Sequence, residues 1–408
     1  MINSTSTVVR RLAHGTASLG RWSTMALGLS IPISIALDNV LLAIVILAWL
    51  AGAHFRTKLL LAWNNPVYRA AVILFAVLLV GTIYGEQAPG DARLYLLKYL
   101  DLALIPILGL AFIAAPDRQR ALQILAIGLA TVLLISCALK VGLIAPNPWL
   151  KATADSPLVF KLRLTHNILM AFAAFLFAWL ACSATNCRTR AVWTLLGALA
   201  VANIGLMVEG ATGYLLLIVL ALLFGWQRAR FKGVAVTVAI AIGVVTALSV
   251  IPGPFHARVQ QIIQELRQER ADRPASTSTG FRLEFYRNTL ALIQKNPVLG
   301  TGTGSFPSVY AQQVEGSGSV ESRNPHNEFM LITVQTGLVG LAAFVWLLWQ
   351  QWRYAPQLPT PIERGLAQGL VVMMCIVCML NSALLDHTEG LLYAWLTALL
   401  YAGLKSDA

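Results

Sequence analysis

Apolar windows of about 15 to 24 residues, separated by short polar segments, run through the whole chain. A window of about 20 apolar residues can cross the hydrocarbon core of a bilayer as a helix, because a helix satisfies its own backbone hydrogen bonds. We place twelve such windows at residues 22–36, 40–53, 67–84, 96–114, 121–144, 166–183, 192–208, 212–225, 234–251, 326–349, 365–385 and 389–404. The sequence therefore predicts an all-α, polytopic membrane protein with about 12 transmembrane helices.

The overall composition agrees with an integral membrane protein. Hydrophobic residues make up 57% of the 408 residues and charged residues only 12%, whereas soluble domains carry roughly 25% charged residues. The formal net charge of +12 comes from cations that are spread over short loops. We interpret this charge as a topology signal and expect no nucleic-acid partner. Because many apolar windows follow the first, and no small-residue cleavage site stands out, we expect no cleavable signal peptide.

Basic residues divide unequally between the two ends of the predicted helices. Sixteen of them fall at one set of ends, namely Arg10, Arg11, Arg21, Arg56, Lys58, Arg69, Arg118, Arg120, Arg188, Arg190, Arg228, Arg230, Lys232, Arg353, Arg364 and Lys405. The opposite short loops carry only Arg93, Lys151, Lys161 and Arg163, with Lys98 close by. Cytoplasmic loops are enriched in Lys and Arg, so both chain termini are predicted to be cytoplasmic.

One long hydrophilic segment, residues 252–325, interrupts the series of apolar windows. Nine predicted transmembrane helices precede it in residues 1–251, and three follow it in residues 326–408. By the same charge argument this segment falls on the extracytoplasmic side. The chain is therefore expected to have two membrane parts joined by one large extracytoplasmic loop.

The loop itself is predicted to be partly helical. Apolar residues at helical spacing indicate an amphipathic helix over residues 258–272, of the kind that can lie on a membrane surface. A second helix is predicted from Phe281 to Lys295, where Asn296-Pro297 ends it. The glycine-rich run Gly300–Ser305 fits no nucleotide-binding spacing, so we interpret it as a turn.

The chain contains none of the common signatures of a metal or cofactor site. Asp-x-Asp, His-Glu-x-x-His, GxxxxGK[ST] and Ser-x-x-Lys are all missing from the sequence. Cys375 and Cys378 have redox-motif spacing, but they lie inside an apolar window without a second pair. We therefore expect no bound metal and no cofactor.

The candidate for acid–base chemistry is His326, which opens the run Pro325-His326-Asn327-Glu328 where the long loop meets the next apolar window. An unperturbed histidine titrates near pH 6.5 and can accept a proton from a hydroxyl group. The alternative is a histidine that caps the following helix at the membrane interface. Gly337 and Gly340 follow in the same window, and small residues of this kind allow another helix to approach closely.

A short acidic loop also falls on the extracytoplasmic side, between the last two predicted helices. Asp386, His387 and Glu389 either line the same vestibule as His326 or merely connect two helices. The sequence leaves both interpretations open.

Several cations on the same side can bind an anionic substrate. Arg282 begins the second loop helix, Arg163 precedes the window at 166–183, and Lys98 lies inside the window at 96–114. Arginine binds phosphate oxygens with a fork of donors and lysine binds them as a point charge. Arg323 and Asn327 flank His326 and are further candidates for contacts with substrate. Each cation can instead be an interface anchor whose stem is buried in apolar surroundings.

These motifs together resemble the O-antigen ligase family, within the larger group of O-antigen polymerases and protein O-oligosaccharyltransferases. The run His326-Asn327, nine residues, Gly337-Leu338-Val339-Gly340 is similar to the ligase motif of that family. Gly280-Phe281-Arg282 through Lys295-Asn296-Pro297-Val298-Leu299-Gly300-Thr301-Gly302 looks like its arginine helix and following turn. The chain departs from the family at Ala211-Thr212-Gly213, where many members carry an arginine, so Arg163 or Lys98 has to supply that charge.

The resemblance implies a GT-C-like glycosyltransferase in the inner membrane of a Gram-negative bacterium, with a periplasmic active site. Its donor would be O-antigen linked to undecaprenyl diphosphate, and its acceptor a sugar hydroxyl of lipid A–core, so the active site would open to membrane lipid. Arg282, with Arg163 and Lys98, would stabilise the leaving diphosphate without a metal, and the helix at 258–272 would act as a lid. His326 would be either the general base or a ligand of the diphosphate, and direct attack would invert the anomeric carbon.

Other functions are compatible with parts of this pattern. An O-antigen polymerase uses the same donor with a second lipid-linked glycan as acceptor, and a protein O-oligosaccharyltransferase transfers the glycan to protein. A twelve-span transporter or flippase is a more distant alternative, since many transporters show two similar halves and no such repeat is visible in this sequence.

Overall fold

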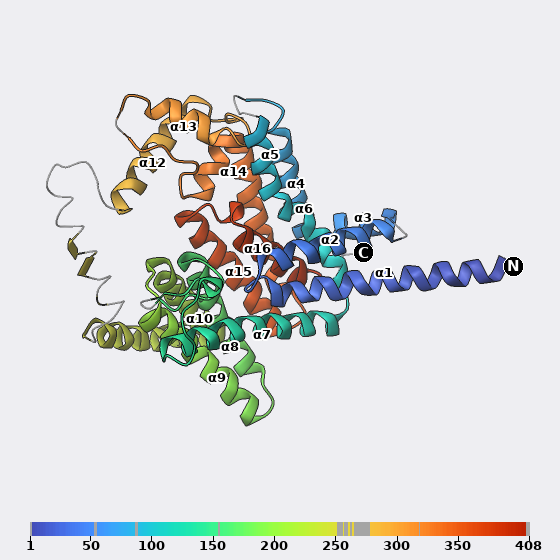
Figure 1. Ribbon diagram of the computed structural model, residues 1–408, viewed down its shortest axis with the longest axis horizontal. Helices are drawn as coiled ribbons and strands as arrows, with labels where there is room; N and C mark the ends of the chain where they lie inside the picture. The colour runs from blue at the N-terminus through green and yellow to red at the C-terminus, as the bar shows by residue number, and fades with distance from the viewer. Residues whose placement is uncertain are drawn as a thin grey trace.

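The computed structural model describes residues 2–52, 55–85, 89–153, 156–250, 278–317 and 319–404, with residues 256, 260, 261, 263 and 264 besides. Most of the amphipathic helix and lid predicted over 258–272 therefore lies outside the described residues. Every regular element in the described part of the chain is helical (Figure 1). The predicted all-α architecture is confirmed.

The helices pack around a densely buried centre. In chain order they are α1 (Ile2–Ser30), α2 (Ile35–Ala51), α3 (Phe55–Asn64), α4 (Pro66–Val80), α5 (Pro89–Lys98), α6 (Leu100–Gly109), α7 (Ala115–Lys140), α8 (Arg163–Ser183), α9 (Cys187–Ala202), α10 (Ala211–Val250), α12 (Ser278–Lys295), α13 (Phe306–Val314), α14 (Glu328–Tyr354), α15 (Pro361–Leu380) and α16 (His387–Tyr401). Short 3-10 segments occur at Leu110–Phe112, Pro148–Leu150, Ala355–Gln357 and Ala383–Leu385, and a π-helical turn at Asn203–Met207.

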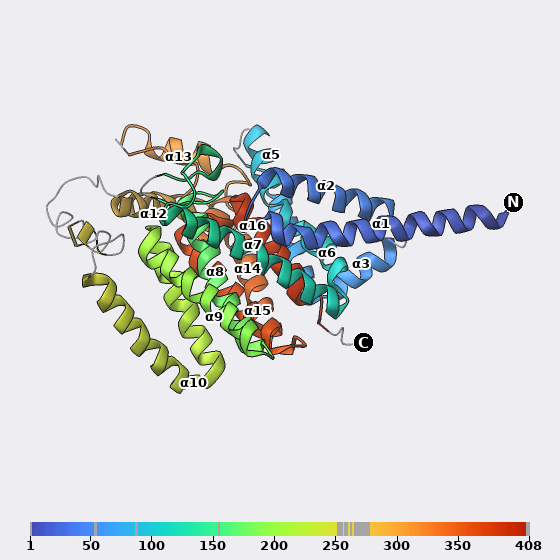
Figure 2. The same ribbon diagram turned by 60° about the horizontal axis from the view of Figure 1, so that its bottom comes forward.

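Each predicted apolar window coincides with a helix in the structure. The windows at 212–225 and 234–251 are the two parts of α10, which breaks where Ala229 and Arg230 leave helical dihedral angles. Figure 2 shows the two parts meeting at this break. Gly225 and Gly233 lie so close there that a Cβ on Gly233 would come within 1.9 Å of the Gly225 carbonyl oxygen.

Fewer helices meet the requirements of a membrane span than the number of apolar windows predicts. In the part of the chain that the structure describes, seven helices are long and apolar enough to cross a membrane, namely Gly90–Phe112, Ala115–Lys140, Arg163–Ser183, Cys187–Met207, Ala211–Thr246, Glu328–Gln357 and Pro361–Leu380. An eighth is counted if α2 and α3, which meet at a bend of 118°, form one broken span. A polytopic membrane protein is confirmed, whereas the predicted number of 12 is not. The windows at 212–225 and 234–251 count as one helix, and those in α1 and α2 do not count as single spans. Helices α4 and α16 have only 15 residues each, fewer than the about 20 that a bilayer requires.

The C-terminal helix α16 forms the centre of the bundle. All its residues from Thr388 to Tyr401 are buried, which is typical of a helix surrounded by other helices. Its polar side chains have partners: the Trp395 indole donates to the Thr24 carbonyl at 2.7 Å, and the Tyr393 hydroxyl donates to Gln351 at 2.8 Å. Because α16 begins at His387, its N-terminal end holds the acidic loop in a fixed position.

Gly337 interrupts α14, and the glycine-rich turn fills the interruption. Gly337 has φ 65° and ψ −162°, a combination that is essentially confined to glycine. The Leu338 amide then donates to the Pro297 carbonyl, and the Gly302 amide donates to the Gln335 carbonyl, both at 2.8 Å. The predicted turn at Gly300–Ser305 is confirmed. The segment that packs closely against Gly337 is therefore this turn, whereas the sequence suggested another helix.

Substitution of Gly337 by alanine is expected to destabilise the protein strongly. The new Cβ would lie 2.0 Å from the Val298 carbonyl oxygen, in addition to the cost of about 1–3 kcal/mol for the backbone conformation. Gly316→Ala is the matched control, because Gly316 has φ 71° and a Cβ added there would meet no atom within 4 Å. Thermal unfolding in detergent should show a much larger fall in Tm for Gly337→Ala. Equal shifts would contradict the close packing of the turn.

Candidate active site

His326 stands in a strained position immediately before α14. Its φ is 53°, a conformation that is uncommon for residues other than glycine and that tends to occur at functional sites. Its amide donates to the Asn324 side chain at 2.9 Å. The helix cap is Asn327, whose side-chain oxygen accepts from the Met330 amide at 3.0 Å. Capping of α14 is therefore performed by the neighbour of His326, and the half-buried imidazole is left available for other contacts.

Two side chains from the far end of the sequence orient the imidazole ring. The His326 Nδ1 lies 3.3 Å from Asn381 Oδ1, and Asn381 Nδ2 donates to Asp386 Oδ2 at 2.7 Å. Because the Asn381 amide group gives its N–H to the carboxylate, its oxygen faces the ring and accepts the Nδ1 proton. In a neutral ring this arrangement puts the lone pair on Nε2, which is the tautomer that a general base needs.

Asp386 ends this chain of hydrogen bonds. Its side chain is exposed toward a cavity but is otherwise enclosed by protein, and this desolvation raises the pKa of the carboxyl above its usual range. The hydrogen bond from Asn381 and the charges of Lys98 and His326 oppose the rise in pKa. When ionised, Asp386 stabilises a positive charge on the imidazole through Asn381, as an orienting carboxylate does in a catalytic triad.

Helix α12 covers His326 from the other side. The Phe285 ring stacks on the imidazole with 5.9 Å between centroids and 28° between planes. The Tyr286 hydroxyl donates to the Met379 carbonyl at 2.9 Å and approaches the His326 carbonyl at 3.4 Å. Arg282 lies three and four residues before these two aromatics, hence on the same face of the helix. Arg282 therefore lies one turn before Phe285 and Tyr286, on the face of α12 that contacts His326, and its side chain is half-buried.

Three of the other predicted residues have partners of their own. Arg323 is 76% exposed and lies 3.6 Å from Asp91, and ion pairs of this kind contribute little to stability. Asn327 donates to the Met379 carbonyl at 3.2 Å besides capping α14. Arg163, at the start of α8, pairs with Glu209 at 3.8 Å.

Lys98 lies at the end of α5 and lines a cavity that Asp101, Asp386 and His387 also line. Of the three predicted cations, Arg282 lies on the α12 face that contacts His326. The charge of Lys98 acts on Asp386, at the end of the hydrogen-bond chain from His326, and Arg163 pairs with Glu209.

The partners of His326 are not evident from the sequence. The sequence motifs do not identify Asn381. They leave Asp386 either as a residue that lines the same vestibule as His326 or as part of a loop that merely connects two helices. In the structure Asp386 is linked to the His326 ring through Asn381 and also lines a cavity. Glu328 is a further buried group next to His326, and it accepts from the Tyr99 hydroxyl at 2.7 Å and from the Leu384 amide at 2.9 Å. These bonds tie α14 to the segment before α6 and to the loop that carries the acidic residues.

The N-terminal end of α16 is also anchored by buried charges. Lys161 is only 3% exposed, donates to the Thr388 hydroxyl at 3.0 Å, and has a pKa lowered by this burial. His387 lies 3.3 Å from the fully buried Asp38 at the start of α2. The loop that positions Asp386 is therefore held from two sides.

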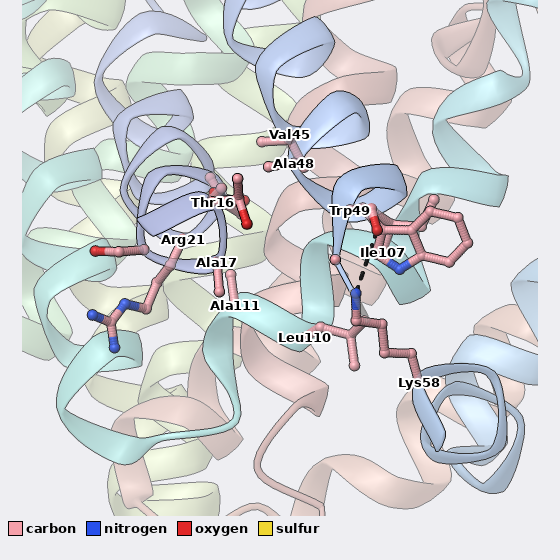
Figure 3. Close-up of a pocket in the computed structure, with 14 residues that line it drawn as sticks. Thr16, Ala17, Arg21, Val45, Ala48, Trp49, Lys58, Ile107, Leu110 and Ala111 are labelled. Carbon is pink, nitrogen blue, oxygen red and sulfur yellow. Dashed lines mark hydrogen bonds between the residues drawn. The ribbon is translucent and has the colours of Figure 1, made fainter. Parts of the chain in front are cut away.

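Another cavity, of about 380 Å³, lies at the opposite end of α2 (Figure 3). Lys58 lines this cavity, and its ammonium group donates to the Trp49 carbonyl at 3.3 Å. The two cavities are lined by different residues of α2: Asn39, Leu42, Ala43 and Ile46 line the cavity next to Asp386, whereas Val45, Ala48 and Trp49 line this one. The cavity in Figure 3 is not part of the site around His326.

Comparison with protein families places the site in a known context. The O-antigen ligase model matches residues 196–345, which include α10, α12, the glycine-rich turn and the part of α14 that carries the glycine motif. Comparison with curated proteins returns no match. The resemblance drawn from the sequence motifs is confirmed: the segment that holds His326 and Arg282 matches the O-antigen ligase family.

Proposed function

We propose that this protein is an inverting, metal-independent glycosyltransferase of lipopolysaccharide biosynthesis. It moves O-antigen polysaccharide from undecaprenyl diphosphate to a sugar hydroxyl of lipid A–core. The observation that carries the proposal is the oriented His326, held by Asn381 and Asp386 on one side and facing the Arg282 face of α12 on the other. The family match over the same segment supports it.

In the proposed reaction, His326 Nε2 accepts the proton of the acceptor hydroxyl. The hydroxyl oxygen forms a bond to the anomeric carbon of the donor sugar, while the bond from that carbon to the diphosphate oxygen breaks. The electron pair leaves with undecaprenyl diphosphate, and Arg282 stabilises the added negative charge with charge-assisted hydrogen bonds. A single displacement of this kind inverts the anomeric configuration.

The other predicted residues have smaller parts in this proposal. Arg163, Lys98 and Arg323 are exposed cations and remain candidates for contacts with the sugar and phosphate groups. Asn327 uses its amide within the protein, so it supports the position of His326. The bias of basic residues favours cytoplasmic termini and an active site in the periplasm of a Gram-negative inner membrane.

The test of this function is the choice of acceptor. The purified protein in proteoliposomes, supplied with undecaprenyl-diphosphate-linked O-antigen, should glycosylate lipid A–core. It should not extend a second lipid-linked glycan, as a polymerase would, nor modify a pilin-type peptide, as a protein O-oligosaccharyltransferase would. Movement of the lipid-linked glycan across the membrane without transfer would instead indicate a flippase and would contradict the proposal.

Asn381 is expected to act as a positioning residue. Asn381→Leu removes the acceptor of the Nδ1 proton, so kcat should fall about tenfold, consistent with the loss of a hydrogen bond of about 1.5 kcal/mol. KM for both substrates should stay unchanged. Asn381→Gln keeps both an amide oxygen for the ring and an amide donor for Asp386, and should retain more activity than the leucine variant. Initial rates at varied concentrations of each substrate measure this difference, and equal rates in all three proteins would refute the role.

A further inference from the structure

The cavity beside Asp386 has a polar end and an apolar length. It encloses about 570 Å³ between α2, α5, α6 and the loop that precedes α16. Lys98, Asp101, Asp386 and His387 line it together with apolar residues of α2 and α6. The contact of His387 with Asp38 places the polar groups near the start of α2.

The apolar part follows α2 away from the polar groups. Leu42, Ala43 and Ile46 line it from α2, and Leu104 lines it from α6. From Asn39 to Ile46 is seven residues, or about 10 Å along a helix. A cavity with these dimensions suits the junction between the polar head of a lipid and the beginning of its hydrocarbon chain.

The charges in the polar end select among lipids. Among the described residues, Lys98 is the one lysine or arginine in the wall, whereas Asp101 and Asp386 contribute two carboxyl groups, and His387 is already opposite Asp38. A diphosphate needs several cations or hydrogen-bond donors, and this wall offers it one ammonium group beside two carboxyl groups. Sugar hydroxyls can instead donate hydrogen bonds to carboxylate oxygens, and a single phosphate can bind the Lys98 ammonium.

We propose that this cavity binds the phosphorylated sugar head of the acceptor glycolipid, with an acyl chain along Leu42, Ala43 and Ile46. The inference rests on the proposed function, since it assigns the acceptor to one place in the same site. Asp386 connects the cavity with the catalytic histidine proposed above, because it lines the cavity and also ends the hydrogen-bond chain from His326. The donor diphosphate is then held on the other side of His326, by Arg282.

Filling the apolar part tests this assignment. Ala43→Trp should raise KM for lipid A–core about tenfold or more and leave KM for undecaprenyl-diphosphate-linked glycan unchanged. Val40→Trp is the matched control, because Val40 is 56% exposed on the same helix and does not line the cavity. A rise in the donor KM, or equal effects of the two substitutions, would overturn the proposal.

Lys98→Ala provides a second variant at an exposed position where folding is not at risk. Loss of one charge-assisted hydrogen bond should raise KM for the acceptor about tenfold. If KM for the donor rises instead, Lys98 binds the diphosphate and the proposal is wrong.

Photo-crosslinking separates this inference from the proposed function, because it does not depend on transfer. Lipid A–core with a photoreactive acyl chain should crosslink to α2 in wild-type protein and in Val40→Trp, but not in Ala43→Trp. Crosslinking without any transfer would support the cavity and contradict the proposed function. Crosslinking that Ala43→Trp does not reduce, or that excess phosphatidylethanolamine abolishes as well as lipid A–core does, would refute the acceptor site.

Discussion

Replacement of His326 by alanine is expected to lower kcat for glycan transfer by about 10²- to 10⁴-fold, the range typical of a lost general base. KM for donor and acceptor should change little, because the imidazole binds a proton that moves only during the reaction. Initial-rate measurements with the purified variant in proteoliposomes give both constants. An unchanged Tm would show that the variant is folded.

The pH dependence of the wild-type enzyme separates the two functions that the sequence leaves open for His326. A general base has to be neutral, so the rate should rise with pH as the imidazole loses its proton. A ligand of the diphosphate has to be an imidazolium, so the rate should instead fall with rising pH. The general-base assignment therefore predicts the rising profile, and a falling profile would assign His326 to the diphosphate. Loss of that pH dependence in His326→Ala identifies the titrating group.

Replacement of Arg282 by alanine should lower kcat by about 10²- to 10³-fold, as removal of a preorganised donor to a developing anion does elsewhere. Arg282→Lys should recover only part of the rate, because a lysine offers a point charge and not a fork of donors. Arg287→Ala is the matched control, since Arg287 is an exposed residue on the same helix. Comparable losses at Arg282 and Arg287 would mean that α12 acts through its overall charge and not through a specific contact.

The sequence predicts the helices well because burial in lipid or in a helix bundle demands apolar residues over a defined length. Each apolar window is a helix in the structure, and Asn296-Pro297 ends α12 as expected. An apolar pattern alone does not establish the number of spans, because a helix such as α16 can be apolar through burial among other helices. The break at Gly337 is also not predicted. It depends on the turn at residues 297–302, which exchanges backbone hydrogen bonds with the α14 residues on either side of Gly337.

The sequence predicts parts of the candidate site to different degrees. Motif spacing identifies His326 and Arg282, and the family match includes both. It does not identify the partners of His326, because Asn381 lies 55 residues later in the chain and only the packing of α15 against α14 brings it to the ring. Lys98 and Arg163 are predicted from their side of the membrane. That criterion does not reveal that Lys98 acts on Asp386 or that Arg163 pairs with Glu209.

The most direct test of the central claim follows donor, acceptor and product in one reconstituted reaction. With purified wild-type protein, we predict that each O-antigen chain joined to lipid A–core releases one undecaprenyl diphosphate, with an inverted anomeric linkage by NMR, and that His326→Ala and Arg282→Ala nearly abolish both signals. Transfer with retained configuration, no transfer by the folded wild-type protein, or wild-type rates in both variants would contradict it.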